Sequence, residues 1–298
     1  MTSPYELKTM SWDLSPSGLL VVTMNNPTAL NPMTFRWAAE MFFVLEHAER
    51  LSEVKVVVLT GSGRAFSAGA SSEMLAMIAK GSEMTPNDYK KALGSELYEI
   101  QRGYDIHDKG QAKDFFPDIA LEGLALRFLK FPKILIAAVN GLAVGGGANI
   151  PLLLADITFT CSDSKFIYPF AQRGVPPELG SSLLLPFLIG LQNSKKFMLL
   201  GEEFGGQEAE RLGLVYKHIS ENGDTFLKQV ISFGEKLAKD PILPGRMLVK
   251  KSINDRTLRM LDGVMRKENM EFVSSTNTPY FKTVTQELLK KLGKTSKL

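Results

Sequence analysis

Apolar and polar positions change along the chain in a way that predicts strands and helices in turn. Apolar runs rich in β-branched residues predict buried strands at residues 18–25, 54–61 and 133–141. Residues 33–51 carry apolar side chains at helical spacing, which predicts an amphipathic helix. The alternation continues over the first two-thirds of the chain, and the pattern is helical from about residue 225 onward. The sequence therefore predicts an α/β core followed by a helical region.

A unit of strand, glycine-containing loop and helix occurs twice, at residues 54–78 and at 133–154. The two copies indicate a loosely repeated unit rather than an array of fixed period. A further strand is expected at KFIYPF. A helix is expected to begin in GSSLLLPFLIG, with Ser181 or Ser182 as its N-cap, because serine side chains accept hydrogen bonds from the first free N–H groups of a helix.

The domain organisation expected from these patterns has two regions. Residues 1–224 form the core that carries the functional site, and residues 225–298 form a helical C-terminal region. Residues 73–130 are expected to be mostly helical but broken, and the polar segment 80–118 within them has the composition of a mobile lid or an insertion.

Composition excludes several classes of protein. The 298 residues are 44% hydrophobic and 22% charged, which is typical of a folded globular protein. The net charge of +3 is spread along the chain without a basic stripe, so no nucleic-acid partner is expected. The single cysteine, Cys161, excludes an internal disulfide framework and follows an apolar run typical of a buried thiol. His47, His107 and His218 lack metal-ligand spacing, so no metal site is expected.

The two ends of the chain bear on its location in the cell. The first residues lack the apolar segment of a secretory signal, and the longest apolar runs are too short to span a membrane, so no membrane insertion is expected. The chain ends in Ser296-Lys297-Leu298, the tripeptide that the peroxisomal import receptor recognises. We therefore predict a peroxisomal protein, the alternative being a chance tripeptide on a lysine-rich tail.

Two loops rich in small residues are candidates for binding a negatively charged oxygen. FSAGASS (66–72) and NGLAVGGGAN (140–149) each precede a predicted helix. Small residues let a ligand approach the backbone, and free N–H groups at a helix start are donors to a developing oxyanion. The structural alternative for each loop is a tight strand-to-helix turn. The second loop also lacks the spaced glycines and acidic partner of a dinucleotide-binding loop.

The third candidate is a lone carboxylate in the stretch YPFAQRGVPPELGSS. Glu178 lies among Val175, Pro176, Pro177 and Leu179. Removal of a carboxylate from water raises its pKa, which suits a group that takes and returns a proton near neutral pH. The structural alternative is that Glu178 caps the helix that follows, since acidic side chains are favoured near helix N-termini.

Four blocks of the sequence follow one another at characteristic spacing. They are NNPTALN (25–31), GSGRAFSAGA (61–70), FPKILIAAVNGLAVGGGANIPLLLADI (131–157) and LLGEEFGGQEAERLGLV (199–215). Together they resemble one family, the enoyl-CoA hydratase/isomerase (crotonase) superfamily. The resemblance covers roughly residues 15 to 255, and the order and spacing of the blocks make it specific. It implies a spiral of repeated ββα units, followed by C-terminal helices that form trimers and, in many members, hexamers.

The resemblance also implies an acyl-CoA substrate, a thioester enolate intermediate and no cofactor. By motif position, the backbone N–H groups of Ala70 and Gly146 would hold the thioester oxygen. Ala29 and Ala68 would join them in binding the substrate.

Departures from the family pattern bear on the reaction. The hydratases carry two catalytic glutamates, and this chain has Asn149 and Phe170 at those positions. Glu178 resembles the single catalytic glutamate of the fungal peroxisomal Δ3,Δ2-enoyl-CoA isomerases, whose YPFAxxG…EGG pattern is similar to YPFAQRGVPPELG here. The resemblance thus implies an isomerase of fatty acid β-oxidation, in which Glu178 moves a proton from C2 to C4.

Other functions remain open at this point. One is a different crotonase reaction, such as dienoyl-CoA isomerisation, hydration or a step of specialised metabolism. Ser71 in place of an acidic residue after AGA, and the long segment 80–118, suggest a specialised member. Another is an acyl-CoA-binding protein without activity. Lys250, Lys251 or other lysines of the helical tail are candidate ligands for the CoA phosphates, but they are not assigned, because solvated charge is the usual role of such lysines.

Overall fold

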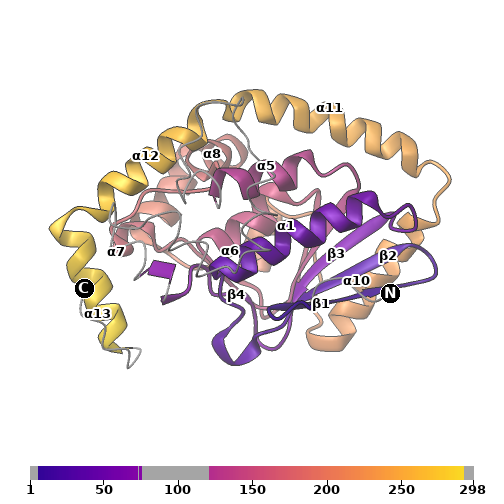
Figure 1. Cartoon of the computed structure of the whole chain (residues 1–298), viewed down its shortest axis with the longest axis horizontal. Coiled ribbons are helices and arrows are strands. Elements are labelled where there is room, and N and C mark those ends of the chain that lie inside the picture. The colour runs from indigo at the N-terminus through magenta and orange to yellow at the C-terminus, as the bar shows by residue number, and fades with distance from the viewer. Residues whose placement is uncertain (1–5, 73, 76–120, 292–298) are drawn as a thin grey trace.

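The computed structural model describes residues 6–72, 74–75 and 121–291 (Figure 1). The polar segment 80–118, most of the region expected to be broken helix, and the terminal Ser-Lys-Leu tripeptide lie outside the described residues. The predictions made for those segments therefore stay predictions.

Two sheets form the centre of the described fold. The larger has the strand order β1-β2-β3-β5-β7-β10 and the smaller has β4-β6-β8-β9. Neighbouring strands from β2 to β10 and from β4 to β8 pair in parallel, whereas β1–β2 and β8–β9 are antiparallel. The strands of the larger sheet are Met10–Leu14, Leu19–Met24, Val56–Gly61, Ile134–Val139, Ile157–Thr160 and Lys217–His218. Those of the smaller sheet are Ala65–Ser67, Leu142–Val144, Lys165–Ile167 and Phe204–Gly205.

Successive strand pairs contribute one strand to each sheet. This holds for β3 and β4, for β5 and β6, and for β7 and β8, and helical residues follow each pair. Two of those helices are short: α6 spans Gly146–Asn149 and α7 spans Phe170–Arg173. The predicted α/β core of repeated ββα units is confirmed, and the structure adds a third unit to the two that the sequence indicated.

Helices cover both faces of the larger sheet. The helix α10 packs against β2, β3 and β5 on one face, while α1 and α5 belong to the cluster on the other. The helices α11, α12 and α13 form an arc along the edge of the molecule, at the end of the chain (Figure 1). The remaining helix bounds are Pro27–Ala29 (η1), Phe35–Arg50 (α1), Gly123–Lys130 (α5), Ile150–Leu154 (η4), Ser181–Leu200 (α8), Gly206–Arg211 (α9), Gly223–Ala238 (α10), Leu243–Leu261 (α11), Val264–Thr276 (α12) and Pro279–Lys291 (α13).

The continuous apolar run of β3 follows from this two-sided cover. Side chains alternate across a strand, so Val57 and Leu59 join the cluster that contains α1. Val56 and Val58 point the other way and join the cluster that contains α10. A parallel strand covered on both faces needs apolar residues at every position, which explains why this segment lacks polar alternation.

The start of α8 differs from the prediction. Its N-cap is Gly180, in the left-handed region at φ 79° and ψ 5°, and neither Ser181 nor Ser182 caps the helix. The carboxylate of Glu268, from α12, accepts hydrogen bonds from the N–H groups of Gly180 at 2.8 Å and Ser182 at 2.9 Å. The prediction was wrong because a side chain distant in sequence satisfies these donors, while the Ser181 hydroxyl accepts from the Glu178 N–H at 3.2 Å.

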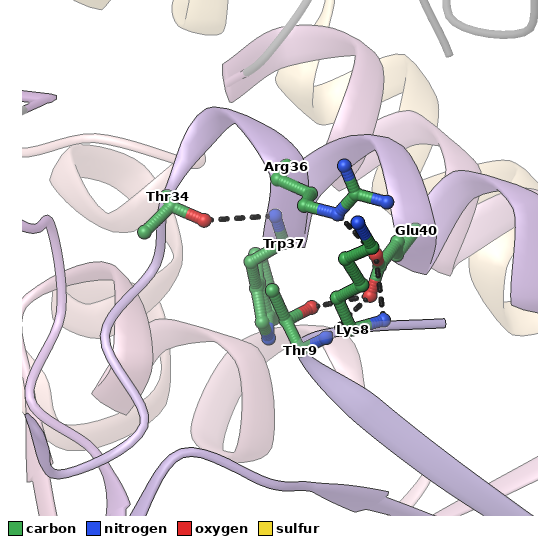
Figure 2. Close-up of polar contacts among 6 residues, drawn as sticks. All are labelled: Lys8, Thr9, Thr34, Arg36, Trp37 and Glu40. Atoms are coloured by element: carbon green, nitrogen blue, oxygen red, sulfur yellow. Dashed lines mark hydrogen bonds and ion pairs between the residues drawn. The ribbon is translucent and has the colours of Figure 1, made fainter. Parts of the chain in front are cut away.

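A buried carboxylate attaches the N-terminal segment to α1 (Figure 2). Glu40 is buried, and it accepts hydrogen bonds from the backbone N–H groups of Lys8 at 3.0 Å and Thr9 at 2.8 Å. The Thr9 hydroxyl donates to it at 2.6 Å, and the Arg36 Nε donates at 2.8 Å. Four donors thus satisfy one carboxylate beside the first strand.

We expect Glu40→Ala to lower the free energy of unfolding by about 1–3 kcal/mol, because several donors lose their acceptor at once. Denaturant unfolding of both proteins measures the difference. The matched control is Glu46→Ala on the same helix, where the ion pair with the exposed Arg50 should contribute under about 1 kcal/mol. Equal losses in the two variants would contradict a structural role for the buried network.

Candidate active site

A mostly apolar pocket lies between loops that follow strands of the smaller sheet and the helix α12. Its empty volume is about 700 Å³, part of which is open to solvent. The walls come from the loop after β4, the glycine loop after β6, α7 with the residues that follow it, and α12. Among the described residues that line it, two are charged: Glu178 and Arg173.

The glycine loop lines this pocket with Gly145 and Gly146, at the start of α6. Gly145 has φ 54°, a conformation that favours glycine, and it precedes the first turn of α6. The N–H groups of Ala148 and Asn149 donate to the Gly145 carbonyl at 2.9 and 3.0 Å. A helix start leaves its first N–H groups without helical partners, and here these belong to Gly146 and Gly147.

Gly146 lies directly against Glu178. Its N–H donates to the Glu178 carboxylate. A Cβ atom on Gly146 would lie 2.8 Å from Glu178 Oε1 and 3.3 Å from Met33 Sδ, so only glycine permits this approach.

The loop after β4 presents a second backbone amide. Met33 pairs with Ala70 in an isolated parallel bridge. Its hydrogen bonds run from the Met33 N–H to the Gly69 carbonyl at 2.8 Å and from the Ser71 N–H to the Met33 carbonyl at 2.9 Å. Because these bonds use the residues on either side, they leave the amide of Ala70 outside the bridge, and Ala70 lines the pocket.

The other two residues expected to bind substrate differ in position. Ala68 lines the pocket, and its N–H donates to the Leu30 carbonyl at 2.8 Å, so this amide is already used. Ala29 ends η1 and is absent from the described lining of the pocket. The structure therefore brings together Ala68, Ala70, Gly146 and Glu178, and it leaves Ala29 outside this group.

Glu178 is partly buried, and its backbone is held from both sides. Its carbonyl accepts from the Asn149 amide at 2.9 Å, and its N–H donates to the Ser181 hydroxyl. Burial raises the pKa of the carboxyl to about 7, the charge of Glu268 adds to this, and the Gly146 N–H opposes it. Near neutral pH the group is therefore close to half protonated, as a proton shuttle requires.

The two positions of the hydratase glutamates hold no ionisable side chain. Asn149 is fully buried, and its amide positions the Glu178 carbonyl. Phe170 is buried, stacks on Tyr168 with ring centroids 5.6 Å apart, and lines the pocket. Among the described lining residues, Glu178 is the one carboxylate.

Sequence reasoning missed three residues at this site. Glu268 and Phe272 come from α12, nearly a hundred residues after Glu178, and no local pattern indicates that they reach it. Glu268 also takes the capping role that was the structural alternative for Glu178. Arg173 could have been noticed, because it is the lone cation of the stretch that contains Glu178.

The two lysines considered for the CoA phosphates have other partners. Lys250 is buried and donates to Asp156 at 2.6 Å and to the Lys133 carbonyl at 2.8 Å. It is therefore a structural residue, and the hypothesis of a phosphate contact is wrong for it. Lys251 is exposed and pairs with Asp255 at 2.9 Å.

Metal binding and membrane insertion find no support in the described residues. They contain no group of three or more histidine, cysteine, aspartate or glutamate side chains that could hold a metal ion. Within the same residues, no helix is long and apolar enough to cross a membrane. Cys161 is buried, as predicted.

Comparison with known proteins identifies the family. The model of the enoyl-CoA hydratase/isomerase family matches residues 15–104 and 92–294. The chain therefore belongs to this family, and the resemblance to the crotonase superfamily is confirmed. It is 27% identical over 245 residues to the 1,2-epoxyphenylacetyl-CoA isomerase of Escherichia coli (strain K12), with 82% of each chain covered.

Two further relatives support the assignment. A probable enoyl-CoA hydratase, echA12 of Mycobacterium bovis, is 34% identical over 199 residues, which cover 66% of this chain and 61% of that protein. The solved structure of Pseudomonas aeruginosa OdaA has a TM-score of 0.76 and 23% identity, with 95% of this chain and 99% of that chain covered. That structural likeness supports the fold alone, and it agrees with the predicted spiral of ββα units.

The raised pKa of Glu178 should appear in the stability of the protein. Because the folded pKa exceeds the unfolded one, the folded state binds more protons between about pH 4.5 and pH 7, so stability falls as pH rises through this range. Glu178→Gln removes the charge. We expect its Tm to exceed that of the wild type by on the order of 2–4 °C at pH 8, with a smaller difference at pH 5.

Thermal unfolding at both pH values measures this difference. The control is Glu210→Gln, which changes an exposed carboxylate on α9 and should leave the difference independent of pH. A Tm difference for Glu178→Gln that is the same at pH 5 and pH 8 would show that the Glu178 carboxyl titrates normally.

Proposed function

We propose that this protein is a Δ3,Δ2-enoyl-CoA isomerase of fatty acid β-oxidation, acting on 3-enoyl-CoA. The observation that carries the proposal is the position of Glu178, the one carboxylate among the described residues of the pocket wall, whose carboxylate accepts from the Gly146 N–H. Its raised pKa, about 7, suits both removal and return of a proton.

In the proposed reaction, the Glu178 carboxylate takes a proton from C2 of the 3-enoyl thioester. The electron pair left at C2 delocalises over the thioester carbonyl and the neighbouring double bond to give a dienolate. The N–H groups of Ala70 and Gly146 donate to the negative oxygen and stabilise it, which requires neither a metal nor a redox cofactor. Glu178 then gives the proton to C4, and the double bond lies between C2 and C3.

The Gly146 N–H has two acceptors in this scheme. In the free protein it donates to Glu178 and lowers the pKa of that carboxyl. When the thioester oxygen takes this N–H, the carboxylate loses a stabilising donor and becomes more basic. Binding of substrate therefore prepares both the oxygen-binding site and the base.

Hydration of a 2-enoyl-CoA is the second candidate, favoured by the names of several relatives as hydratases. Against it, Asn149 is committed to the Glu178 backbone and Phe170 to an aromatic stack, so neither can activate water. A hydratase here would have to use Glu178 alone as acid and base. Dienoyl isomerisation, a specialised reaction and binding without catalysis remain further alternatives.

The direct test offers trans-3-hexenoyl-CoA and trans-2-hexenoyl-CoA separately and identifies products by absorbance and mass. We expect conversion of the 3-enoyl ester to the 2-enoyl ester, with kcat/KM rising with pH through about 7 as Glu178 ionises in the free protein. Glu178→Gln should lower the rate by ~10²–10⁴-fold, because it removes the acid–base group.

The control Glu210→Gln, far from the pocket wall, should keep the wild-type rate. Addition of water to the 2-enoyl ester without isomerisation of the 3-enoyl ester would support the hydratase instead. Full isomerase activity in Glu178→Gln would refute the assignment of the base.

We also propose that the protein assembles as a homotrimer or homohexamer. Large apolar side chains are exposed on the outer helices, among them Phe187 and Leu191 on α8 and Leu248 and Ile253 on α11. An interface with further copies of the chain would cover these side chains, which supports an oligomer. Light scattering distinguishes a trimer from a hexamer.

We also propose that the protein is imported into peroxisomes through its terminal Ser296-Lys297-Leu298. A fluorescent tag at the N-terminus should place the full chain in peroxisomes. Deletion of Leu298 alone should leave it in the cytosol, because the receptor recognises the terminal tripeptide. Persistent peroxisomal fluorescence of the shortened chain would show that another address suffices.

A further inference from the structure

The pocket contains a cation for which the proposed reaction has no use. Arg173 is the last residue of α7, is partly buried and lines the pocket. The neighbouring lining residues are apolar: Phe170, Val175 and Phe272. An arginine is rarely placed against apolar walls without a partner, because its charge loses contact with water.

No side chain among the described residues pairs with this guanidinium. Burial lowers the pKa of Arg173, and no carboxylate in the described part of the chain opposes that effect. The nearby acidic residues of α12 have other partners: Glu268 accepts from the start of α8, and Glu271 faces Lys267. Glu178 is held by Gly146, and its pKa is set without a contribution from Arg173.

Glu178 and Arg173 line the same pocket but belong to different parts of its wall. Ala70 and Gly146 form the end that would hold the thioester oxygen, and Glu178 lies beside it. Arg173 belongs to the wall built by α7 and α12, together with Phe272. Because Glu178 and Arg173 line the same pocket, an acyl chain that passes Glu178 can continue along the pocket toward Arg173.

Arginine binds carboxylates through paired N–H donors, and such a bond is strong where water is limited. A plain hydrocarbon chain would cover the guanidinium without offering it an acceptor, which weakens binding. We propose that the pocket selects an acyl-CoA whose acyl chain carries a carboxylate at its far end, and that Arg173 binds this carboxylate. The proposal deepens the proposed function and rests on it for the direction of the acyl chain.

Binding of unreactive esters tests the proposal without any turnover. Calorimetry compares saturated monocarboxylic esters (butanoyl-, hexanoyl- and octanoyl-CoA) with their ω-carboxyl partners (succinyl-, adipoyl- and suberoyl-CoA) on the wild-type protein. We expect the ω-carboxyl ester to bind roughly tenfold to hundredfold more tightly at the length that reaches Arg173, the range expected for a hydrogen bond to a charged group.

Three variants locate the effect. Arg173→Met keeps much of the side-chain volume and should abolish the preference while leaving hexanoyl-CoA affinity unchanged or improved. Arg173→Lys keeps the charge and should retain part of the preference. Arg211→Met removes one positive charge from an exposed ion pair with Glu208 and should retain all of it.

Several outcomes would overturn the proposal. One is equal affinity for both members of every pair. Another is a preference that survives in Arg173→Met. A third is equal weakening of both members in that variant, which would assign Arg173 to the CoA phosphates that all the esters share. The preference could also be found while neither trans-3-hexenoyl-CoA nor its ω-carboxyl counterpart reacts. In that case the proposed function fails and Arg173 is confirmed as a carboxylate site.

Discussion

The contact between the Glu178 carboxylate and the Gly146 N–H is the interaction on which the site depends. It requires a glycine at position 146, because any Cβ atom there would collide with the carboxylate. It also requires the glycine-opened turn of α6, which leaves that N–H without a helical acceptor. The base and the oxygen-binding donor are thus built as one unit, and a change in either alters the other.

Two carboxylates, Glu178 and Glu268, interact in this region, and their hydrogen bonds differ. Burial raises the pKa of Glu268, and the two N–H groups at the start of α8 that donate to it oppose this rise. Glu178 has fewer donors, and the neighbouring charge of Glu268 raises its pKa further. The difference in hydrogen bonding gives the two acids different tasks: Glu268 fixes the helix, and Glu178 remains able to exchange a proton.

Local patterns predicted much of the fold. The runs that became β2, β3 and β5, the amphipathic α1 and the glycine turn before α6 each depend on residues close in sequence, and each prediction was confirmed. The loops of Ala70 and Gly146 and the stretch of Glu178 were also identified, because small residues and a lone carboxylate are visible in the sequence. That these segments meet at one pocket was not predictable from local patterns, because it depends on the order of the strands in the two sheets.

The predictions that failed concern contacts between distant segments. Serine is a good N-cap, but the donors at the start of α8 are satisfied by Glu268 from α12. A solvated charge is the usual role of a lysine such as Lys250, yet this one is buried against Asp156 and the Lys133 carbonyl. No local rule indicates either contact, because each partner comes from another part of the chain.

The position of α12 has a consequence for the synthesis of the protein. This helix supplies Glu268 and Phe272, so one wall of the pocket and part of the electrostatic environment of Glu178 come from the last fifth of the chain. A nascent chain that has already folded its sheets still lacks these groups. The site is therefore completed only when translation is nearly finished, and a chain truncated before α12 lacks both this wall of the pocket and the charge of Glu268.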